Sequence, residues 1–528
     1  PASTSTPVST RTPASTSTPT PTPTPTPAPS DTTIVDEVLY ASYMGINKLN
    51  VDPNNNLYLS SSSSVNASPV IKNKSGTVVS SVTFSQLSAS FCKINNSRVL
   101  DSGQFVSSGS ASGSVNYVFD ASGNYFISGI FFAASATLYN KDGVAQGIIY
   151  NGGGSSTIPT SYVSKFSPSG THLFTHIFTS TVNSIITDIT CDSSGNLIVC
   201  GGYVNNAKIY YGMNTTSTVA ATYTVPTGGL LDRFIFFVTK FDSSGNLKSS
   251  AFVATGLSAL NMSLFVRCDS LGNIYLAGTT DSVYIYNSAG VSYGVAENRT
   301  ASMGFFSFVI KFDANVIYSI YRCIKNTSSL STYCYDLAFD SNNNFYLVGE
   351  VLGSTWTLTG STITYNGGST TITGYICKFN TSGAIQFIKN IAPSSYQIGL
   401  RSITIDKLDN VYISGYYSYS PNSLGLTVKI IENDLAKSTI NGIPPNASAN
   451  IILMKFDSSG TYKYIKYIGS GSTESVVSLA NSNQFLYIVT LGGASGPTVI
   501  YNEDLSVNYT SPSNFTINNP ISRIYILK

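Results

Sequence analysis

The chain repeats one short pattern about seven times: an apolar residue, an aspartate, a Ser/Gly/Asn-rich turn, and an apolar strand that ends near glycine. Clear copies begin at Val51, Phe119, Cys191, Cys268, Phe339 and Ile405, and a weaker copy begins at Ala480. A second pattern, in which Lys-Phe precedes another tight turn, alternates with the first, as in VTKFDSSGN from Val238 and LMKFDSSG from Leu453. Two tight-turn hairpins per unit make a four-stranded antiparallel blade, so the repeat predicts an all-β, seven-bladed β-propeller.

Length and charge limit the alternatives. A chain of 528 residues would ordinarily suggest several domains, but a closed ring of blades is one unit because no blade covers its own faces alone. Only 10% of the residues are charged and the net charge is +2, so no basic patch indicates nucleic acid. No apolar stretch of about 18 residues predicts a transmembrane segment.

Residues 1–30 differ in composition from the rest. They contain alternating Thr-Pro from Pro19 to Pro27 and one charged residue, Arg11. Proline lacks the backbone N–H that helices and sheets require, so the segment is expected to be an extended polyproline II stalk or linker. Ser/Thr with Pro is typical of O-glycosylated stalks. The candidate O-glycosylation sites are Thr18, Thr20, Thr22, Thr24 and Thr26.

The two ends of the repeat region complement each other. The last unit ends in RIYILK, from Arg523 to Lys528, without an outer strand, whereas EVLYASYMG, from Glu37 to Gly45, resembles the outer strand TYKYIKYIG that starts at Thr461. Residues 31–528 are therefore predicted to form the propeller, with residues 31–45 as the outer closing strand of the last blade. The match predicts a natural domain end at Lys528. A start at Pro1 instead of Met indicates a processed form or a fragment, and a removed leader would imply export.

An insertion with hairpin signals, such as YIYNSAGVSYGV, lies between the second and third strands of each unit. We expect these insertions to decorate one face of the ring, and that face to be the better binding surface.

The repeated aspartates raise the question of a cation site. Each stands alone before its turn, whereas a Ca²⁺ loop supplies several oxygens from one short segment. We interpret them as Asx turns, in which the carboxylate accepts backbone N–H bonds. The positions are Asp52, Asp120, Asp192, Asp269, Asp340 and Asp406, with Asn481 in the seventh unit.

One lysine per unit precedes the second turn. A ring of these lysines could line an anion-binding channel, but we favour pairing with the Asp turn or with a carbonyl of a neighbouring strand, which would fix the register between blades. The positions are Lys93, Lys165, Lys240, Lys311, Lys378, Lys455 and Lys528.

No cofactor, metal or catalytic site is predicted. The seven cysteines contain no CxxC motif and fall where other units have Val, Ile or Phe; small buried hydrophobes are the favoured interpretation, with one disulfide left open. His172 and His176 would lie about 13 Å apart on a strand, too far for one zinc ion.

Asparagine sequons are numerous, but chance alone accounts for that number in a chain so rich in Asn, Ser and Thr. Those in the insertions would tolerate glycans if the protein is exported. The candidate N-glycosylation sites are Asn214, Asn298, Asn508 and Asn514.

The units resemble the seven-bladed β-propeller repeat family called SBBP. The resemblance rests on DRFIFFVTKFDSSGN from Asp232 and CDSLGNIYLAGTTDS from Cys268, and it covers residues 35–528. It implies a structural repeat found mainly in secreted and cell-surface proteins. The chain departs from the family in lacking a Trp after Lys-Phe, since its single Trp is Trp356, in an insertion.

The leading hypothesis is a non-enzymatic extracellular structural or adhesive protein, a subunit of a surface appendage, filament or particle exterior. Its discs would mediate protein–protein or glycan contacts, by self-association or with other surface proteins. A lectin-like carbohydrate-binding propeller is the alternative, and a secreted lyase or glycosidase is a third.

Overall fold

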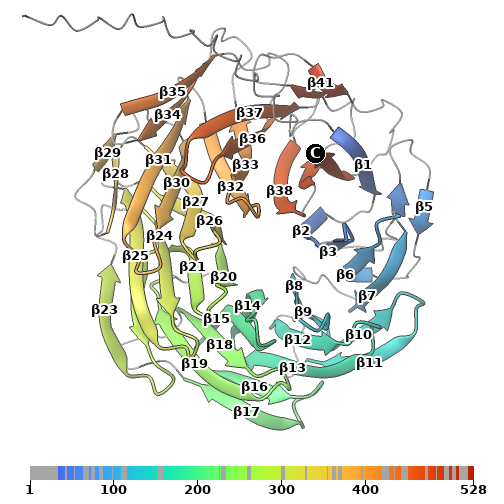
Figure 1. The fold of residues 1–528 in the computed structure, drawn as a ribbon. Helices are drawn as coiled ribbons and strands as arrows, with labels where there is room; N and C mark the ends of the chain where they lie inside the picture. Colours follow the sequence, from blue (N-terminus) through green and yellow to red (C-terminus); the bar gives the residue numbers. More distant parts are fainter. Residues whose placement is uncertain are drawn as a thin grey trace, which may run out of the picture.

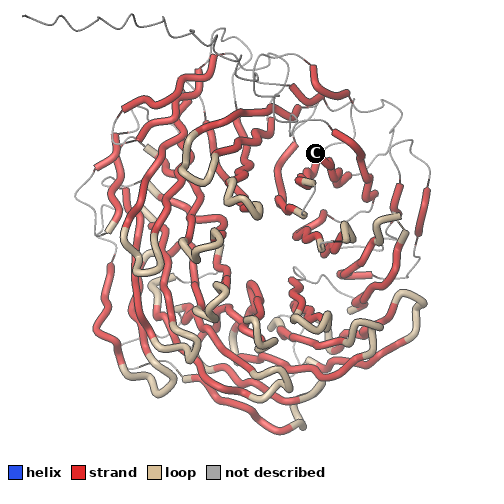
Figure 2. Tube along the Cα trace, viewed as in Figure 1, coloured by secondary structure: helices blue, strands red, loops and turns tan. Residues whose placement is uncertain are grey.

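The structure is a computed structural model, and it describes residues 34–527 apart from connecting stretches, of which the longest are 63–69, 109–115, 419–426, 442–449 and 511–520. The described strands form seven antiparallel sheets of six strands each, arranged around a central axis (Figure 1). Figure 2 shows strands and loops but no helix in the described residues. Accordingly, none of the described residues form a helix that could span a membrane. The all-β propeller prediction is confirmed.

We number the blades by their inner strands along the chain. Each has four core strands, of which the first lies nearest the axis. Blades 1 to 4 contain β2 (Gly45–Val51), β3 (Leu57–Ser62), β6 (Leu87–Ile94), β7 (Leu100–Ser107); β8 (Asn116–Phe119), β9 (Tyr125–Phe131), β12 (Thr160–Phe166), β13 (His172–Ser180); β14 (Asn183–Cys191), β15 (Leu197–Val204), β18 (Phe234–Phe241), β19 (Leu247–Ala254); and β20 (Leu264–Cys268), β21 (Ile274–Thr280), β24 (Phe306–Phe312), β25 (Tyr318–Asn326). Blades 5 to 7 contain β26 (Thr332–Phe339), β27 (Phe345–Leu352), β30 (Ile372–Phe379), β31 (Ile385–Pro393); β32 (Gln397–Ile405), β33 (Val411–Ser418), β36 (Asn450–Phe456), β37 (Tyr462–Gly469); and β38 (Glu474–Asn481), β39 (Leu486–Gly492), β42 (Ile521–Leu527), β1 (Ile34–Ala41).

The hydrophobic core lies between the blades. Every residue of β18, FIFFVTKF, is buried, because a middle strand is covered on both faces by the adjacent blades. One cluster joins Phe236 of blade 3 to Phe308 of blade 4, whose rings stack 6.2 Å apart. Near-continuous apolar runs are what such doubly covered strands require.

The N-terminal strand closes the ring. Strand β1 pairs with β42 in an antiparallel register that matches Val38 to Ile524 and Ala41 to Ile521. Strand β1 thus takes the outer position of the last blade, with narrower bounds than the predicted residues 31–45. Residues 1–30 and Lys528 lie outside the described residues.

The insertions are placed differently from the prediction. Each forms a hairpin that pairs with the fourth strand of the preceding blade, not with its own. In one case β22, which follows β21 of blade 4 in the chain, pairs with β19 of blade 3 and matches Ile285 to Val253. The expectation of a decorated face was wrong, because the fourth strand of each blade would otherwise leave an open sheet edge that the hairpin covers.

These hairpins extend the predicted four-stranded unit to six strands and form the periphery of the disc in Figure 1. On blade 7 and then on blades 1 to 6, they are β4 (Val70–Lys72) with β5 (Val78–Ser81), β10 (Ser135–Asn140) with β11 (Ala145–Tyr150), β16 (Ala207–Tyr211) with β17 (Thr218–Tyr223), β22 (Ser282–Tyr286) with β23 (Ser292–Asn298), β28 (Thr355–Leu358) with β29 (Thr364–Asn366), β34 (Thr427–Glu432) with β35 (Leu435–Asn441), and β40 (Val499–Tyr501) with β41 (Val507–Thr510). Each hairpin thus ties its own blade to its neighbour.

Candidate functional site

The inner strands enclose a central cavity of about 510 Å³. One position per blade, four residues before the turn that follows the inner strand, lines it: Lys48, Asn116, Asp188, Phe265, Asp336, Ser402 and Ser478. On β2, β14, β26, β32 and β38 a β-bulge directly precedes this position. A bulge re-aims the following side chain, so the same local irregularity recurs around the cavity wall.

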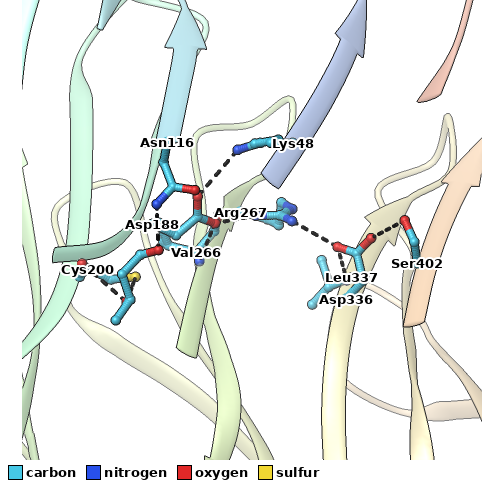
Figure 3. A network of polar contacts seen from close by, with 10 residues as sticks. Lys48, Asn116, Asp188, Cys200, Val266, Arg267, Asp336, Leu337 and Ser402 are labelled. Carbon is cyan, nitrogen blue, oxygen red and sulfur yellow. Dashed lines mark hydrogen bonds and ion pairs between the residues drawn. The ribbon is translucent and has the colours of Figure 1, made fainter. Parts of the chain in front are cut away.

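Figure 3 shows the charged network that three of these positions, Lys48, Asp188 and Asp336, form with Arg267. The Asp188 carboxylate lies 3.3 Å from Lys48 Nζ and 2.5 Å from Arg267 Nη1. Arg267 bridges to the next carboxylate, because its Nη2 lies 2.9 Å from Asp336 Oδ1. Burial disfavours the charged form of Asp188, but the neighbouring Lys48 and Arg267 outweigh burial and keep its pKa below the ordinary value.

The same carboxylates also satisfy backbone groups of the next blade. Asp188 accepts from the N–H of Val266, and Asp336 accepts from the N–H of Ile403 at 3.1 Å. Ser402 Oγ accepts from the N–H of Leu479. An inner strand is a sheet edge whose N–H groups need partners. The polar positions therefore join adjacent blades at the cavity wall.

A second charged cluster lies beside the cavity, between blades 5 and 6. The Glu350 carboxylate on β27 accepts from the hydroxyl groups of Tyr335 at 2.9 Å and Tyr416 at 3.1 Å. It also lies 3.2 Å from Arg401 Nη2. Burial raises the pKa of Glu350 to about 7, although the hydrogen bond from Tyr416 acts in the opposite direction.

The Glu350 cluster does not follow the repeat. Glu350 follows Gly349, whereas uncharged residues, Ile130 and Thr279, follow the corresponding glycines of blades 2 and 4. Gly399 leaves room for the carboxylate, because a Cβ atom there would lie 2.2 Å from Glu350 Oε2. The repeat that builds the propeller therefore does not require the buried carboxylate between blades 5 and 6.

The turn aspartates lie at the ends of the inner strands and serve the turns. Asp52 Oδ1 accepts from the N–H groups of Asn54 and Asn56, both at 2.9 Å. The same two bonds, from the residues two and four positions later, occur at Asp120, Asp192, Asp269, Asp340 and Asp406. With these acceptors occupied, the aspartates form Asx turns, and none of the described residues form a cluster of three or more His, Cys, Asp or Glu that could hold a metal.

The seventh turn differs from the prediction. Asn481 pairs with Leu486 as the last residue of β38, so Ser482 takes the aspartate position in a turn that is one residue shorter. Asn481 Nδ2 instead donates to Thr404 Oγ1 and to the carbonyl of Ile405, both at 2.8 Å. The assignment of Asn481 to the aspartate series was wrong because the shortened turn shifts the alignment.

The repeated lysines contact turn residues, both in their own blade and in the next blade. Three approach the turn aspartate of their own blade: Lys165 with Asp120, Lys240 with Asp192, and Lys378 with Asp340. Three donate to a turn carbonyl of the next blade: Lys165 to Ser243, Lys240 to Ala314, and Lys311 to Thr381. Lys93 pairs with Asp101, and Lys455 lies over the Tyr412 ring. None of these lysines lines the central cavity.

The histidines and cysteines lie away from the central cavity. The Nε2–H of His176 donates to the carbonyl of Gly245 at 2.8 Å, and burial lowers the pKa of His176 to about 4. His172 contacts Thr175 Oγ1. All seven cysteines are free and are buried or half-buried, so the disulfide left open by the sequence does not form.

The predicted glycosylation sites are only partly within the described residues. Asn214 lies in the β16–β17 turn, where its Oδ1 accepts from the Thr216 N–H. Asn298 is exposed at the end of β23, and Asn508 lies on β41. Asn514 and the stalk threonines Thr18, Thr20, Thr22, Thr24 and Thr26 lie outside the described residues.

Sequence reasoning missed the cavity network. Aligning the units on the turn residue and reading back four positions yields Lys48, Asp188 and Asp336, which are charged where other blades have Asn, Phe or Ser. Charged residues at a position that is uncharged in the other blades were the sequence signal that could have predicted the cavity network. The Glu350 and Arg401 pair gave no comparable signal, because the two residues lie on different strands of different blades.

Comparisons with known proteins assign no family. No protein-family model matches the chain, so the SBBP resemblance stays a prediction. A WD repeat-containing protein of Acanthamoeba polyphaga mimivirus, itself described as uncharacterized, is 25% identical over 318 residues, which cover 54% of this chain and 22% of that protein. The chain therefore matches less than a quarter of this relative's length.

The solved structures that the chain resembles are distant from it. Dipeptidyl peptidase 4 of Porphyromonas gingivalis is 9% identical, with a TM-score of 0.37 over 90% of this chain and 60% of that chain. The Dos1 propeller is 10% identical, with a TM-score of 0.30 over 78% of this chain and 92% of that chain. Likenesses this distant carry no functional argument.

Proposed function

We propose that this protein is a non-enzymatic interaction propeller, a rigid disc that binds other copies of itself through its rim. The observation that carries the proposal is an apolar surface on the hairpin of blade 1, which we call the rim patch: Ile148 and Tyr150, with 43% and 49% of their surface exposed. Ile148 and Tyr150 flank the buried Ile149 on β11, so they share one exposed face.

The rim patch suits a second copy of the chain. Strand β11 is the last strand of its sheet, and AQGIIY carries no charge that would repel an identical strand. The only charged residues of the hairpin, Lys141 and Asp142, neutralise each other at its tip. A two-fold axis through this patch would bring the same apolar residues together from both discs.

Two further observations favour binding over catalysis. The mimivirus relative is named as a WD repeat-containing protein, which fits a role in protein–protein interaction. The carboxylates of Asp188 and Asp336 accept from cations and from backbone N–H groups. Carboxylates engaged in this way are poor general acids or bases.

An extracellular structural or adhesive role, with a glycosylated stalk, is part of the same proposal. Its support is compositional: the Thr-Pro run from Pro19 to Pro27 and the low charge of the chain. Mass measurement of peptides from native material tests it. We expect excess mass on peptides from residues 1–30; unmodified peptides would argue against the stalk.

Sedimentation velocity over a range of concentrations tests the rim contact. We expect the wild-type protein to associate, and the double variant Ile148→Lys/Tyr150→Lys to remain monomeric because it buries two charges in the contact. Leu173→Lys is the matched control, since Leu173 is 50% exposed but lies on β13, outside the rim hairpins. Association that is unchanged in the double variant would contradict the proposal.

A further inference from the structure

The central cavity has more positive than negative charge on its wall. Its charged lining residues are three cations, Lys48, Arg267 and Arg401, and two carboxylates, Asp188 and Asp336. Lys48, Asp188, Arg267 and Asp336 form the network of Figure 3. Arg401 pairs instead with Glu350, which is not among the lining residues of the cavity. The excess cation is therefore Arg401.

The two carboxylates have little acceptor capacity to spare for a cationic ligand. Asp188 accepts from Lys48, Arg267 and the Val266 N–H. Both oxygens of Asp336 are likewise occupied, Oδ1 by Arg267 and the Leu337 N–H, and Oδ2 by Ser402 and the Ile403 N–H. A ligand in this cavity would therefore meet hydrogen-bond donors first.

Arg401 is the donor with unused capacity. It lines the cavity with 27% of its side chain exposed. Its guanidinium carbon lies 3.6 Å from the centre of the Tyr335 ring, which holds the group in place. Nη1 is buried and has no hydrogen-bond partner among the described residues. A buried guanidinium nitrogen without an acceptor is costly, so the pair with Glu350 does not fully satisfy the guanidinium.

The counter-ion of Arg401 lies behind it. Glu350 has 5% of its side chain exposed and does not line the cavity. The titratable groups of the described residues that face its carboxylate are Tyr335 from β26, Arg401 from β32 and Tyr416 from β33. Of these, only Arg401 is charged near neutral pH. Protonation of Glu350 therefore leaves Arg401 without a counter-ion.

We propose that the central cavity binds a small oxyanion, of the carboxylate or sulfate class, at Arg401, and that the oxyanion takes over from Glu350 as its counter-ion. The binding-competent form is the one with Glu350 protonated. This inference does not depend on association through the rim patch.

Isothermal titration calorimetry with acetate and with sulfate tests the proposal, because neither anion changes charge between about pH 6 and pH 8. Since the pKa of Glu350 is about 7, the competent fraction falls about tenfold over that range, and the apparent affinity should fall with it. Glu350→Gln should keep the higher affinity at both pH values. Binding of either anion in this way supports the site and identifies its class.

The variant Arg401→Met/Glu350→Gln removes both charges of the pair and should lose the binding. Lys208→Met is the matched control, because Lys208 is an exposed cation on β16 away from the cavity. Thermal melting of each variant checks folding, and the Glu350→Gln result stands even if the double variant fails to fold. No binding to wild type near pH 6, or equal binding in the double variant, would overturn the proposal.

Discussion

The ammonium group of Lys240 lies 2.8 Å from the carboxylate of Asp192, the turn aspartate of the same blade. It also donates to the carbonyl of Ala314 in the next blade at 2.7 Å. Both partners of the ion pair are nearly enclosed, with 9% and 6% of their side chains exposed. One lysine thus supports a turn within a blade and a contact between two blades.

Replacing this lysine should destabilise the ring. Lys240→Met leaves the Asp192 carboxylate buried without its cation, and we expect a loss of about 3 kcal/mol in the free energy of unfolding. Denaturant titration followed by circular dichroism measures it, with Lys208→Met as the exposed control. An unchanged midpoint would show that the lysine does not fix blade register.

The single tryptophan reports on the interlocked hairpins. Trp356 lies on β28, pairs opposite Asn326 of blade 4, and is fully buried in a cluster that includes residues of blades 4 and 5. Its fluorescence should shift at the same denaturant concentration as the far-ultraviolet signal of the whole ring. Trp356→Ala should cost about 3 to 5 kcal/mol. An early fluorescence transition would mean that the hairpin is a separable decoration.

Glu350 makes stability depend on pH. Because its folded pKa, about 7, exceeds the ordinary 4.5, the folded state holds the proton more tightly than the unfolded chain. The contribution of Glu350 to the free energy of unfolding is therefore fully present below about pH 4.5. It declines by roughly 3 kcal/mol as the pH rises to about 7. Glu350→Gln should flatten that part of the stability curve. An identical pH dependence in the variant would argue against a buried, protonated carboxyl group.

His176 changes the pH dependence of stability in the opposite direction to Glu350. Burial lowers its pKa from 6.5 to about 4, so its contribution is present above about pH 6.5 and is lost as pH falls to about 4. Its ring packs 4.8 Å from that of Phe174 and 4.9 Å from that of Phe241, so His176→Phe preserves the apolar contacts. The variant should resist acid better than wild type in melts below about pH 6. Equal acid sensitivity would contradict the assignment.

The repeat predicted the architecture because strand alternation and turn residues are local properties. The match between Glu37–Gly45 and an outer strand even identified the closing strand. The placement of the hairpins could not be predicted this way, because the pairing of β22 with β19 depends on an open edge in another blade. The Glu350 and Arg401 pair likewise depends on which side chains adjacent blades bring together.

Electron microscopy of the purified protein at high concentration tests the central claim most directly, because it shows how the discs meet. The account predicts pairs of discs joined edge to edge through the hairpin of blade 1, with Ile148 and Tyr150 at the contact. Discs that remain single at high concentration, or that stack face to face with the rim free, would contradict it.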